Sequence, residues 1–255
     1  MVILKIGGNV LNNPVALPSA LDYFASLAEP AILVHGGGRK ASEIITEMGR
    51  EPKMVDGRRI TDAPTLEIVT MVYAGLLNKQ VVADLQARGC NAIGLSGADG
   101  NAILAQKRPV KTIDYGFAGD VLGANAPLLK TLLQAGLNPV LCPITHDRKG
   151  QLLNTNADTI ANETAKALAA AEETVSLRYC FEFPGVMKDI NDPDSWIPIL
   201  TPESYAGYKA DGTIAGGMIP KLDNAFAAVA AGVGEVVIGD LAALRAGEGT
   251  RCLNS

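Results

Sequence analysis

Short apolar runs alternate along this chain with longer stretches in which apolar residues recur at helical spacing. Such alternation is typical of a mostly parallel sheet whose strands are joined by helices. We predict strands over 2–6, 31–34, 90–95, 138–142, 174–181 and 235–238. Helices are predicted over 17–28, 40–48, 65–88, 128–135, 158–170 and 221–231. The pattern therefore predicts an α/β fold with an open, mostly parallel central sheet sandwiched by helices.

Two stretches depart from this alternation. Residues 96–123 are rich in Gly, Asp and Lys and contain short β-type fragments, which favours hairpins at a sheet edge. Residues 189–202 form an irregular Pro- and Asp-containing segment that is too short for an interdomain linker. We therefore predict a division near residue 171, with an N-terminal lobe over 1–171 and a C-terminal lobe over 172–255.

Composition and charge narrow the class of protein. The 255 residues are 48% hydrophobic, which is too apolar for a disordered chain. With 22 Lys and Arg against 27 Asp and Glu, no basic excess is available to bind nucleic acid. No stretch reaches the roughly 18 apolar residues of a membrane helix, and the apolar start is too short for a signal peptide. We expect a cytoplasmic protein that binds neither nucleic acid nor membrane.

The four cysteines and two histidines argue against a metal site. The cysteines are scattered without CxxC spacing, which predicts buried thiols in place of disulfides or bound zinc. They are Cys90, Cys142, Cys180 and Cys252.

Two predicted strands end in consecutive glycines, Gly7–Gly8 and Gly36–Gly38. Bare backbone amides that open a helix can bind an anion, and the helix N-terminus adds partial positive charge. A lone glycine pair is more often a tight turn, but two clusters on neighbouring strands favour an anion site at the carboxyl edge of the sheet. Neither cluster has the spacing of a dinucleotide-binding or Walker motif.

Several charged residues stand where a structural role alone would not require them. Lys5 interrupts an aliphatic strand, and Lys221 opens a helix, where the dipole disfavours a cation unless an anion is bound. Asp158 either caps a helix or orients a lysine. Arg58 and Arg59 are adjacent in an extended segment, so only one of them is expected to clamp a carboxylate.

Taken together, eight segments resemble the amino acid kinase superfamily and, within it, the acetylglutamate kinases. They follow the family's order over nearly the whole length. The segments are Lys5–Gly8, His35–Gly38, Gly57–Thr61, Gly94–Gly100, Gly116–Val121, Asn154–Asp158, Gly217–Lys221 and Gly249–Arg251.

The resemblance implies transfer of a phosphoryl group from ATP to the side-chain carboxylate of an N-acyl-L-glutamate, a step of arginine biosynthesis. Lys5 and Lys221 would flank the phosphoryl group, and Asp158 would hold both lysines in place. The acylamino acid and the transferred phosphoryl group would be bound by Gly8, Gly37, Gly38, Arg59, Asn154 and Asn156. ATP would be bound by Gly7, Phe181, Glu182, Gly185, Met187, Thr213, Ile214 and Ala215, and would bring Mg²⁺ with it.

The chain also departs from the family pattern. Glu182 stands where most relatives have Asp, and the unusual 178–189 segment leaves open whether the substrate is N-acetyl- or N-succinyl-L-glutamate. The first strand begins at residue 2, without the extra helix of arginine-inhibited hexamers, so we expect a homodimer without arginine feedback. Two other functions remain open: a sibling kinase with another acceptor, and a non-catalytic nucleotide or amino-acid sensor.

Overall fold

The computed structural model describes residues 1–55, 57–171 and 173–254. Its centre is an eight-stranded sheet that is parallel except for one antiparallel pair, β15 with β16. This confirms the predicted α/β class with an open, mostly parallel sheet. In spatial order the strands are β14 (Ile199–Leu200), β16 (Thr250–Cys252), β15 (Glu235–Gly239), β11 (Ser176–Cys180), β1 (Val2–Ile6), β2 (Ala31–His35), β8 (Asn138–Leu141) and β5 (Ala92–Leu95).

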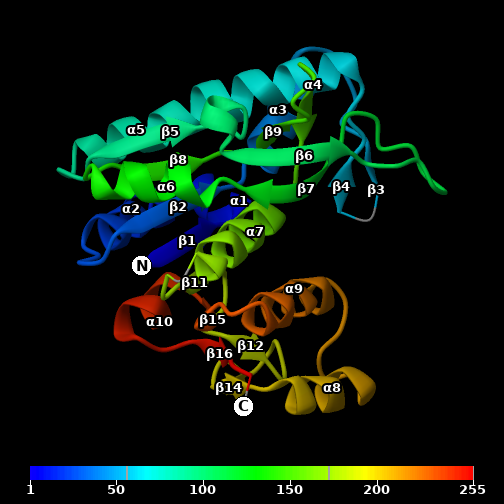
Figure 1. The fold of residues 1–255 in the computed structure, drawn as a ribbon. Coiled ribbons are helices and arrows are strands. Elements are labelled where there is room, and N and C mark those ends of the chain that lie inside the picture. The colour runs from blue at the N-terminus through cyan, green and yellow to red at the C-terminus, as the bar shows by residue number, and fades with distance from the viewer. Residues whose placement is uncertain (56, 172, 255) are drawn as a thin grey trace.

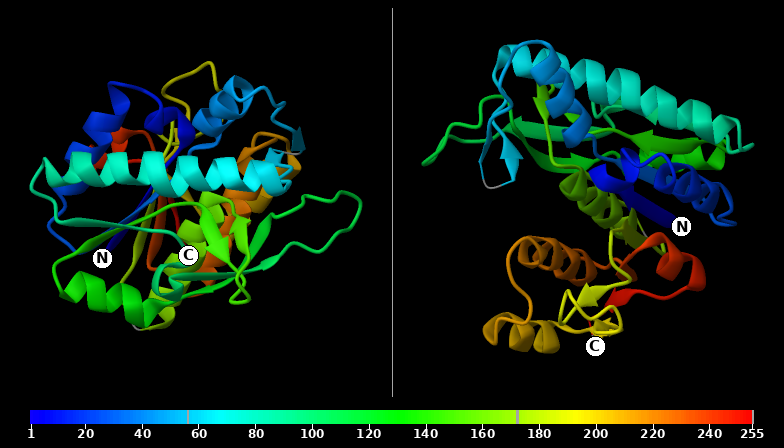
Figure 2. Two further views of the ribbon diagram at one scale, coloured as in Figure 1. Left: turned by 90° about the horizontal axis from the view of Figure 1, so that it is seen from above. Right: turned by 180° about the vertical axis from the view of Figure 1, so that it is seen from behind.

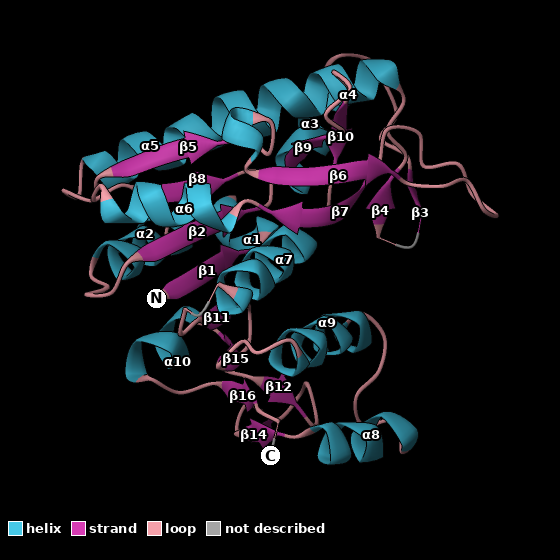
Figure 3. Ribbon diagram, viewed as in Figure 1, coloured by secondary structure: helices cyan, strands magenta, loops and turns pink. Residues whose placement is uncertain are grey.

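Helices cover both faces of this sheet (Figures 1 and 3). Alternation along β1 sends Val2, Leu4 and Ile6 to one face and Ile3 to the other. The Val2 face packs on α1 (Gly8–Leu11), α2 (Ala16–Ala25), α5 (Asn78–Gln86) and α10 (Leu241–Ala246). The Ile3 face packs on α6 (Ala126–Gln134), α7 (Ala157–Ala170), α8 (Pro202–Ala210) and α9 (Met218–Ala230). Lys5 shares the face of Ile3, which directs it toward α7 and α9.

Residues 96–123 form a hairpin at a sheet edge, as predicted, but the sheet is a second one and not the central sheet. Strands β6 (Ile103–Lys107) and β7 (Gly119–Ala124) pair antiparallel in a separate four-stranded sheet with β9 (Ile144–His146) and β10 (Leu152–Asn154). β6 pairs with β9, so β7 is the outermost strand of this second sheet. The β6–β7 connection projects from the body of the protein (Figure 2). The small elements β3 (Met54–Val55), β4 (Arg58–Arg59) and the 3₁₀ turn η2 (Asp99–Asn101) lie in the same half.

The helix predicted over 65–88 is one continuous helix whose middle part has π-helical hydrogen bonding. It consists of α4 (Ala63–Thr70), the π-helical segment η1 (Met71–Leu77) and α5. Asp62 caps its start by accepting a hydrogen bond from the Thr65 amide at 2.9 Å. Helix α3 (Gly38–Glu47) packs against it.

The segment 189–202, predicted to be irregular, contains two short strands, β13 (Trp196–Ile197) and β14. β13 pairs with β12 (Val186–Met187), which precedes the segment. Helix α8, absent from the sequence prediction, follows directly with Thr201 and Ser204 in a capping box and Pro202 in its first turn. The four cysteines are buried free thiols, as predicted. None of the helices in the described residues is long and apolar enough to cross a membrane.

The sheet strands divide by sequence into two halves. β14, β16, β15 and β11 come from the C-terminal part of the chain, and β1, β2, β8 and β5 from the N-terminal part. The two sets meet in the parallel ladder between β1 and β11, which runs from Val2–Ser176 to Ile6–Cys180. In Figure 1 the elements after β11 gather in the lower half. Residue 172, where we predict that the second lobe begins, lies outside the described residues.

Candidate active site

The two glycine turns lie side by side at the carboxyl edge of the sheet. β1 and β2 pair in parallel with Ile6 opposite His35, and the Gly36 amide donates to the Ile6 carbonyl at 3.3 Å. A methyl group added at Gly36 would lie 3.7 Å from the Gly8 nitrogen, so the two turns almost touch. Gly8 opens α1 and Gly38 opens α3, and both helices therefore direct their N-termini toward the same region.

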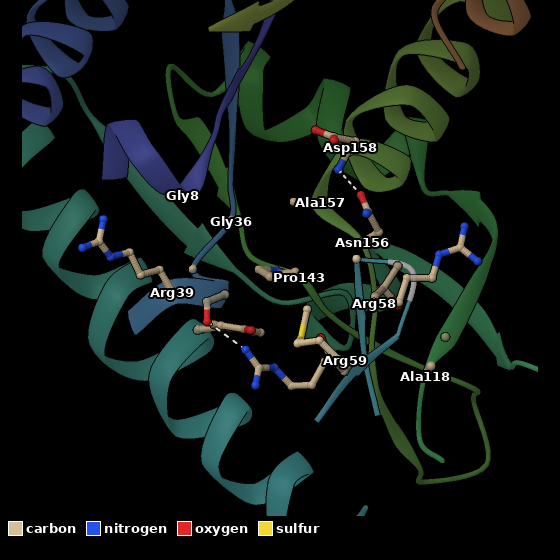
Figure 4. Close-up of a pocket in the computed structure, with 18 of the residues that line it drawn as sticks. Gly8, Gly36, Arg39, Arg58, Arg59, Ala118, Pro143, Asn156, Ala157 and Asp158 are labelled. Carbon is tan, nitrogen blue, oxygen red and sulfur yellow. Dashed lines mark hydrogen bonds between the residues drawn. The ribbon is translucent and has the colours of Figure 1, made fainter. Parts of the chain in front are cut away.

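Three charged side chains from three elements meet beside these turns. The Asp158 carboxylate, in the first turn of α7, lies 2.6 Å from the Lys5 Nζ of β1. Its other oxygen lies 3.7 Å from the Lys221 Nζ, in the first turn of α9. Asn156, not Asp158, caps α7, because its Oδ1 accepts from the Asp158 amide at 2.7 Å (Figure 4). This leaves the Asp158 carboxylate free to bridge the two lysines.

Burial and charge act in opposite directions on the pKa values of Asp158 and Lys221. Burial alone would raise the pKa of Asp158, but the positive charges of Lys5 and Lys221 outweigh it and lower that pKa. For Lys221, burial is the largest influence and lowers its pKa, while Asp158 opposes the shift. The Lys221 ammonium also lies over the rings of Phe181 and Tyr179, 5.0 and 5.6 Å from their centroids.

Two cavities meet at this triad. The arginine cavity, of about 360 Å³, is lined by the second glycine turn, Arg39, Arg58, Arg59 and the 154–158 segment. The aromatic cavity, of about 200 Å³, is lined by Tyr179, Phe181, Glu182 and Lys221. Lys5 and Gly8 line both. Lys5, Asp158 and Lys221 therefore lie at the boundary between the two cavities.

The predicted carboxylate clamp lies inside the arginine cavity. Arg59 is 6% exposed, and its Nη2 donates to the Gly38 carbonyl and to the Ser42 hydroxyl, both at 2.8 Å. Its Nη1 is buried without a hydrogen-bond partner, so one arm of the guanidinium is available to an anion. Arg58 is exposed at the rim, in line with the expectation that only one of the two clamps. Figure 4 shows Arg59 and Asp158 at opposite ends of this cavity.

Asn154 and Asn156 also line the arginine cavity. The Asn154 amide donates to the Thr61 hydroxyl at 2.9 Å, which ties β10 to the segment after Arg59. Asn156 faces the cavity while its Oδ1 serves the start of α7. The structure thus brings Gly8, Gly37, Gly38, Arg59, Asn154 and Asn156 to one space, as the sequence predicts.

The structure brings only some of the residues predicted to bind a nucleotide into one cavity. Gly7, Phe181 and Glu182 line the aromatic cavity. Within the described chain, five others line neither cavity: Gly185, Met187, Thr213, Ile214 and Ala215. Gly185 is explained by packing, since a Cβ there would lie 2.6 Å from the Thr250 hydroxyl. Ile214 is 1% exposed and packs in the core, so its side chain is not available to a ligand.

Several residues that line the arginine cavity were not predicted from the sequence. Tyr73 of η1 and Pro143, between β8 and β9, line the arginine cavity, as do Arg108 and Gly119 of the projecting hairpin. Gly119 has no room for a side chain, because a Cβ would lie 2.4 Å from the Thr155 hydroxyl. Only the Gly116–Val121 segment carried a signal, through the resemblance. Tyr73 had none, since an aromatic residue in an apolar helix is usually core.

Comparison with known proteins points to the same family over nearly the whole chain. The model of the amino acid kinase family matches residues 1–240. An acetylglutamate kinase of Bacteroides thetaiotaomicron is 55% identical over 98% of this chain and 97% of its own length. An acetylglutamate kinase of Methanopyrus kandleri is 41% identical over 98% and 99%.

Among solved structures, smu.665 from Streptococcus mutans UA159 superposes with a TM-score of 0.80 at 25% identity, covering 100% of this chain and 98% of that one. A carbamate kinase from Giardia lamblia bound to AMP-PNP, at 16% identity, shares the fold with a TM-score of 0.70 over 100% and 98%.

Proposed function

The chain belongs to the amino acid kinase family, and from this premise we propose that it phosphorylates the side-chain carboxylate of N-acetyl-L-glutamate with ATP. The product is an acyl phosphate, and the step belongs to arginine biosynthesis. The observation that carries the proposal is the Lys5–Asp158–Lys221 triad at the junction of the two cavities. Relatives named acetylglutamate kinase, similar over nearly the full length, support the same acceptor.

The reaction joins two anions, so charge is its main obstacle. A carboxylate oxygen of the acceptor attacks the γ-phosphorus, a new P–O bond forms, and the bond to the leaving ADP oxygen breaks. No proton is transferred, because the attacking carboxylate has none to lose. The site therefore needs cations and amide donors and does not need a general base.

Each part of the site then has a role in this proposal. Lys5 and Lys221 neutralise the oxygens of the phosphoryl group from two sides, and the amides at Gly8 and Gly37 donate hydrogen bonds to them. Asp158 accepts no proton and keeps the two ammonium groups at a fixed separation. The free arm of Arg59 binds a carboxylate of the acylamino acid.

The two-lobe division follows the same arrangement. Among the residues that the structure describes, those lining the arginine cavity all lie between 5 and 158, and the aromatic cavity adds residues 179–182 and Lys221. We therefore propose that residues 1–171 bind the acceptor and that residues 172–255 bind ATP. The predicted ATP contacts at Gly185, Met187 and 213–215 lie outside both cavities, and of these the loop 213–215 precedes α9, the helix that carries Lys221.

Mg²⁺ is proposed to arrive with the nucleotide. Among residues 1–55, 57–171 and 173–254, no three His, Cys, Asp or Glu side chains gather into a group able to hold a metal ion. Mg²⁺ in phosphoryl-transfer sites is held largely by phosphates and water, which fits this composition.

The acyl group of the acceptor is a finer question. A succinyl group would bring one more carboxylate and would need one more cation. Arg39 and Arg58 line the arginine cavity, whereas Lys40 lies outside it and pairs with Glu43 at 3.2 Å. If the substrate is N-succinyl-L-glutamate, Arg58→Ala raises its KM while leaving the KM of N-acetyl-L-glutamate near the starting value.

We further propose a homodimer without arginine feedback. Met71 and Leu76 of η1 are 57% and 51% exposed, and a second copy would cover such apolar surface. Light scattering tests the assembly, because a dimer has twice the 26.6 kDa of the chain. A hexamer, or inhibition by arginine, would contradict the proposal.

One assay tests the function as a whole. ATP-dependent hydroxamate formation is measured with N-acetyl-L-glutamate, N-succinyl-L-glutamate, free glutamate and aspartate in parallel. Turnover on an acylated substrate supports the proposal and rules out a sensor that only binds ligands. Activity confined to free glutamate or aspartate would show a sibling kinase, and ATP binding without any turnover would favour the sensor.

A further inference from the structure

The long helix α4–η1–α5 changes its hydrogen-bonding pattern where it passes the second glycine turn. Thr70 and Asn78, on either side of η1, both have right-handed helical backbone angles, so the helix continues without a break. In a π-helix the bonds run from residue i to i+5, and such segments are rare and often lie at functional sites. Residues four and five apart then come to one side, whereas in an α-helix residues three and four apart do so.

Tyr73 and Leu77, four residues apart, contact Gly37, and Asn78, five residues after Tyr73, contacts His35 at the start of the glycine turn. A Cβ added at Gly37 would lie 2.6 Å from the Leu77 Cδ1 and 2.9 Å from the Tyr73 Cδ1. The two side chains thus press directly on the Gly37 backbone, whose φ of +154° already disfavours any other residue.

The third contact is a chain of buried hydrogen bonds. The Asn78 Nδ2 lies 3.2 Å from the His35 Nε2 and donates to the Val140 carbonyl at 2.9 Å. The His35 Nδ1 lies 2.7 Å from the Gly36 carbonyl. Because a carbonyl only accepts, Nδ1 carries the proton and Nε2 accepts from Asn78. The chain therefore runs from the helix through the ring to the glycine turn.

Both polar members of this chain are removed from solvent. Asn78 is 1% exposed and His35 is 0% exposed, so each hydrogen bond is costly to lose. Burial lowers the pKa of His35 to about 4, which keeps the ring neutral and able to accept from Asn78 at neutral pH. The contact with Gly37 and the bond to His35 hold the turn from two sides.

We propose that Tyr73, Leu77 and Asn78 are positioning residues for phosphoryl transfer, which the π-helical segment brings together to hold the Gly36–Gly38 turn in its anion-binding conformation. This rests on the proposed function, in which the Gly37 amide binds the transferred group. None of the three residues needs to contact the phosphoryl group. Their effect is to fix the direction of the amides, so their loss acts on turnover more than on ATP affinity.

The test compares Asn78→Ala with Leu85→Ala in the full-length protein. Leu85 is fully buried in α5 and packs on the opposite face of the sheet from the triad, so its loss opens a cavity in the same helix away from the turn. We expect Asn78→Ala to lower kcat roughly 10- to 100-fold with the KM for ATP nearly unchanged, as for a small misplacement of a catalytic group. Hydrogen exchange of the amides in 35–38 rises in Asn78→Ala and does not rise in Leu85→Ala.

Two outcomes overturn the proposal: unchanged exchange in 35–38, or an equal loss of kcat in the Leu85→Ala control. If Asn78→Ala does not fold, Tyr73→Ala and Tyr73→Phe replace it. Tyr73→Phe keeps the ring on Gly37, so it must retain more turnover than Tyr73→Ala. If the proposed function itself is wrong, the unmutated protein has no turnover on N-acylglutamates, which is a separate observation. The exchange comparison then decides the positioning role by itself.

Discussion

Replacement of Asp158 by asparagine removes the negative charge that two buried ammonium groups share. The side chain keeps its shape, so the change isolates charge from packing. The Lys5, Lys221 and Asp158 side chains are only 11%, 15% and 25% exposed. Without the carboxylate, two like charges remain close together with little water to screen them.

The expected loss of stability can be bounded. Removing one partner of a buried ion pair costs about 3–5 kcal/mol, and the lower end applies here because a quarter of the carboxylate is exposed. A destabilisation of about 3 kcal/mol corresponds to a fall in Tm of about 6–12 °C for a chain of this size. The matched control is Asp22→Asn. Asp22 is 58% exposed and pairs with Arg88 at 2.7 Å, a surface pair worth less than about 1 kcal/mol.

Thermal unfolding with and without ATP tests this reasoning. The phosphates of ATP supply the missing negative charge in Asp158→Asn, so the gap in Tm between variant and parent narrows when ATP is bound. Turnover falls roughly 10- to 100-fold, because the lysines lose their common support. An Asp158→Asn protein with unchanged Tm, or with a gap that ATP does not narrow, would refute the proposed role of the triad.

Three further predictions concern single residues. Lys5→Ala and Lys221→Ala each lower turnover by at least about 10²–10³-fold, and a near-parental rate in single-turnover assays would remove that lysine from the mechanism. Arg59→Lys loses the fork that holds Gly38 and an anion together, so the KM of the acylamino acid rises roughly 10- to 100-fold in steady-state kinetics, with little change for ATP. The folded-state pKa of His35, about 4, lies below its ordinary 6.5, so stability falls as the pH drops through this window, by about 3 kcal/mol. Denaturant titrations between pH 6.5 and 4 measure this fall in the free energy of unfolding, and we expect it to be absent from His35→Gln. An equal fall in both proteins would contradict the prediction.

The parts of the site that lie on strands were predictable. A lysine in an aliphatic strand and glycines at two strand ends are local signals, and parallel pairing of β1 with β2 follows from the alternation of strands and helices. Asp158 and Lys221 were predictable because each opens a helix that begins at the same edge. Periodicity of 2.0 and 3.6 thus determines much of what lies at the junction.

Other parts depend on packing that no local pattern records. The π-helical segment η1 lies where the helix contacts the Gly37 turn, and the apolar residues of 65–88 are equally compatible with a regular α-helix. Helix α8 was missed because its mixed sequence lacks a clear apolar face, although Thr201 and Pro202 mark its start. Arg59 was selected over Arg58 by the resemblance, whereas its burial comes from the depth of the cavity.

The ladder between β1 and β11 constrains how this protein can move. Lys5 lies on β1 and Asp158 on α7, both in the N-terminal part of the chain, whereas Lys221 lies on α9 in the C-terminal part. Five consecutive residue pairs join the two halves of the sheet. Sliding one half past the other would break that register, and it would also separate α7 from α9, which pack together across the ladder. A movement that took Lys221 away from Lys5 and Asp158 would therefore have to twist the sheet about this ladder and leave its hydrogen bonds in place.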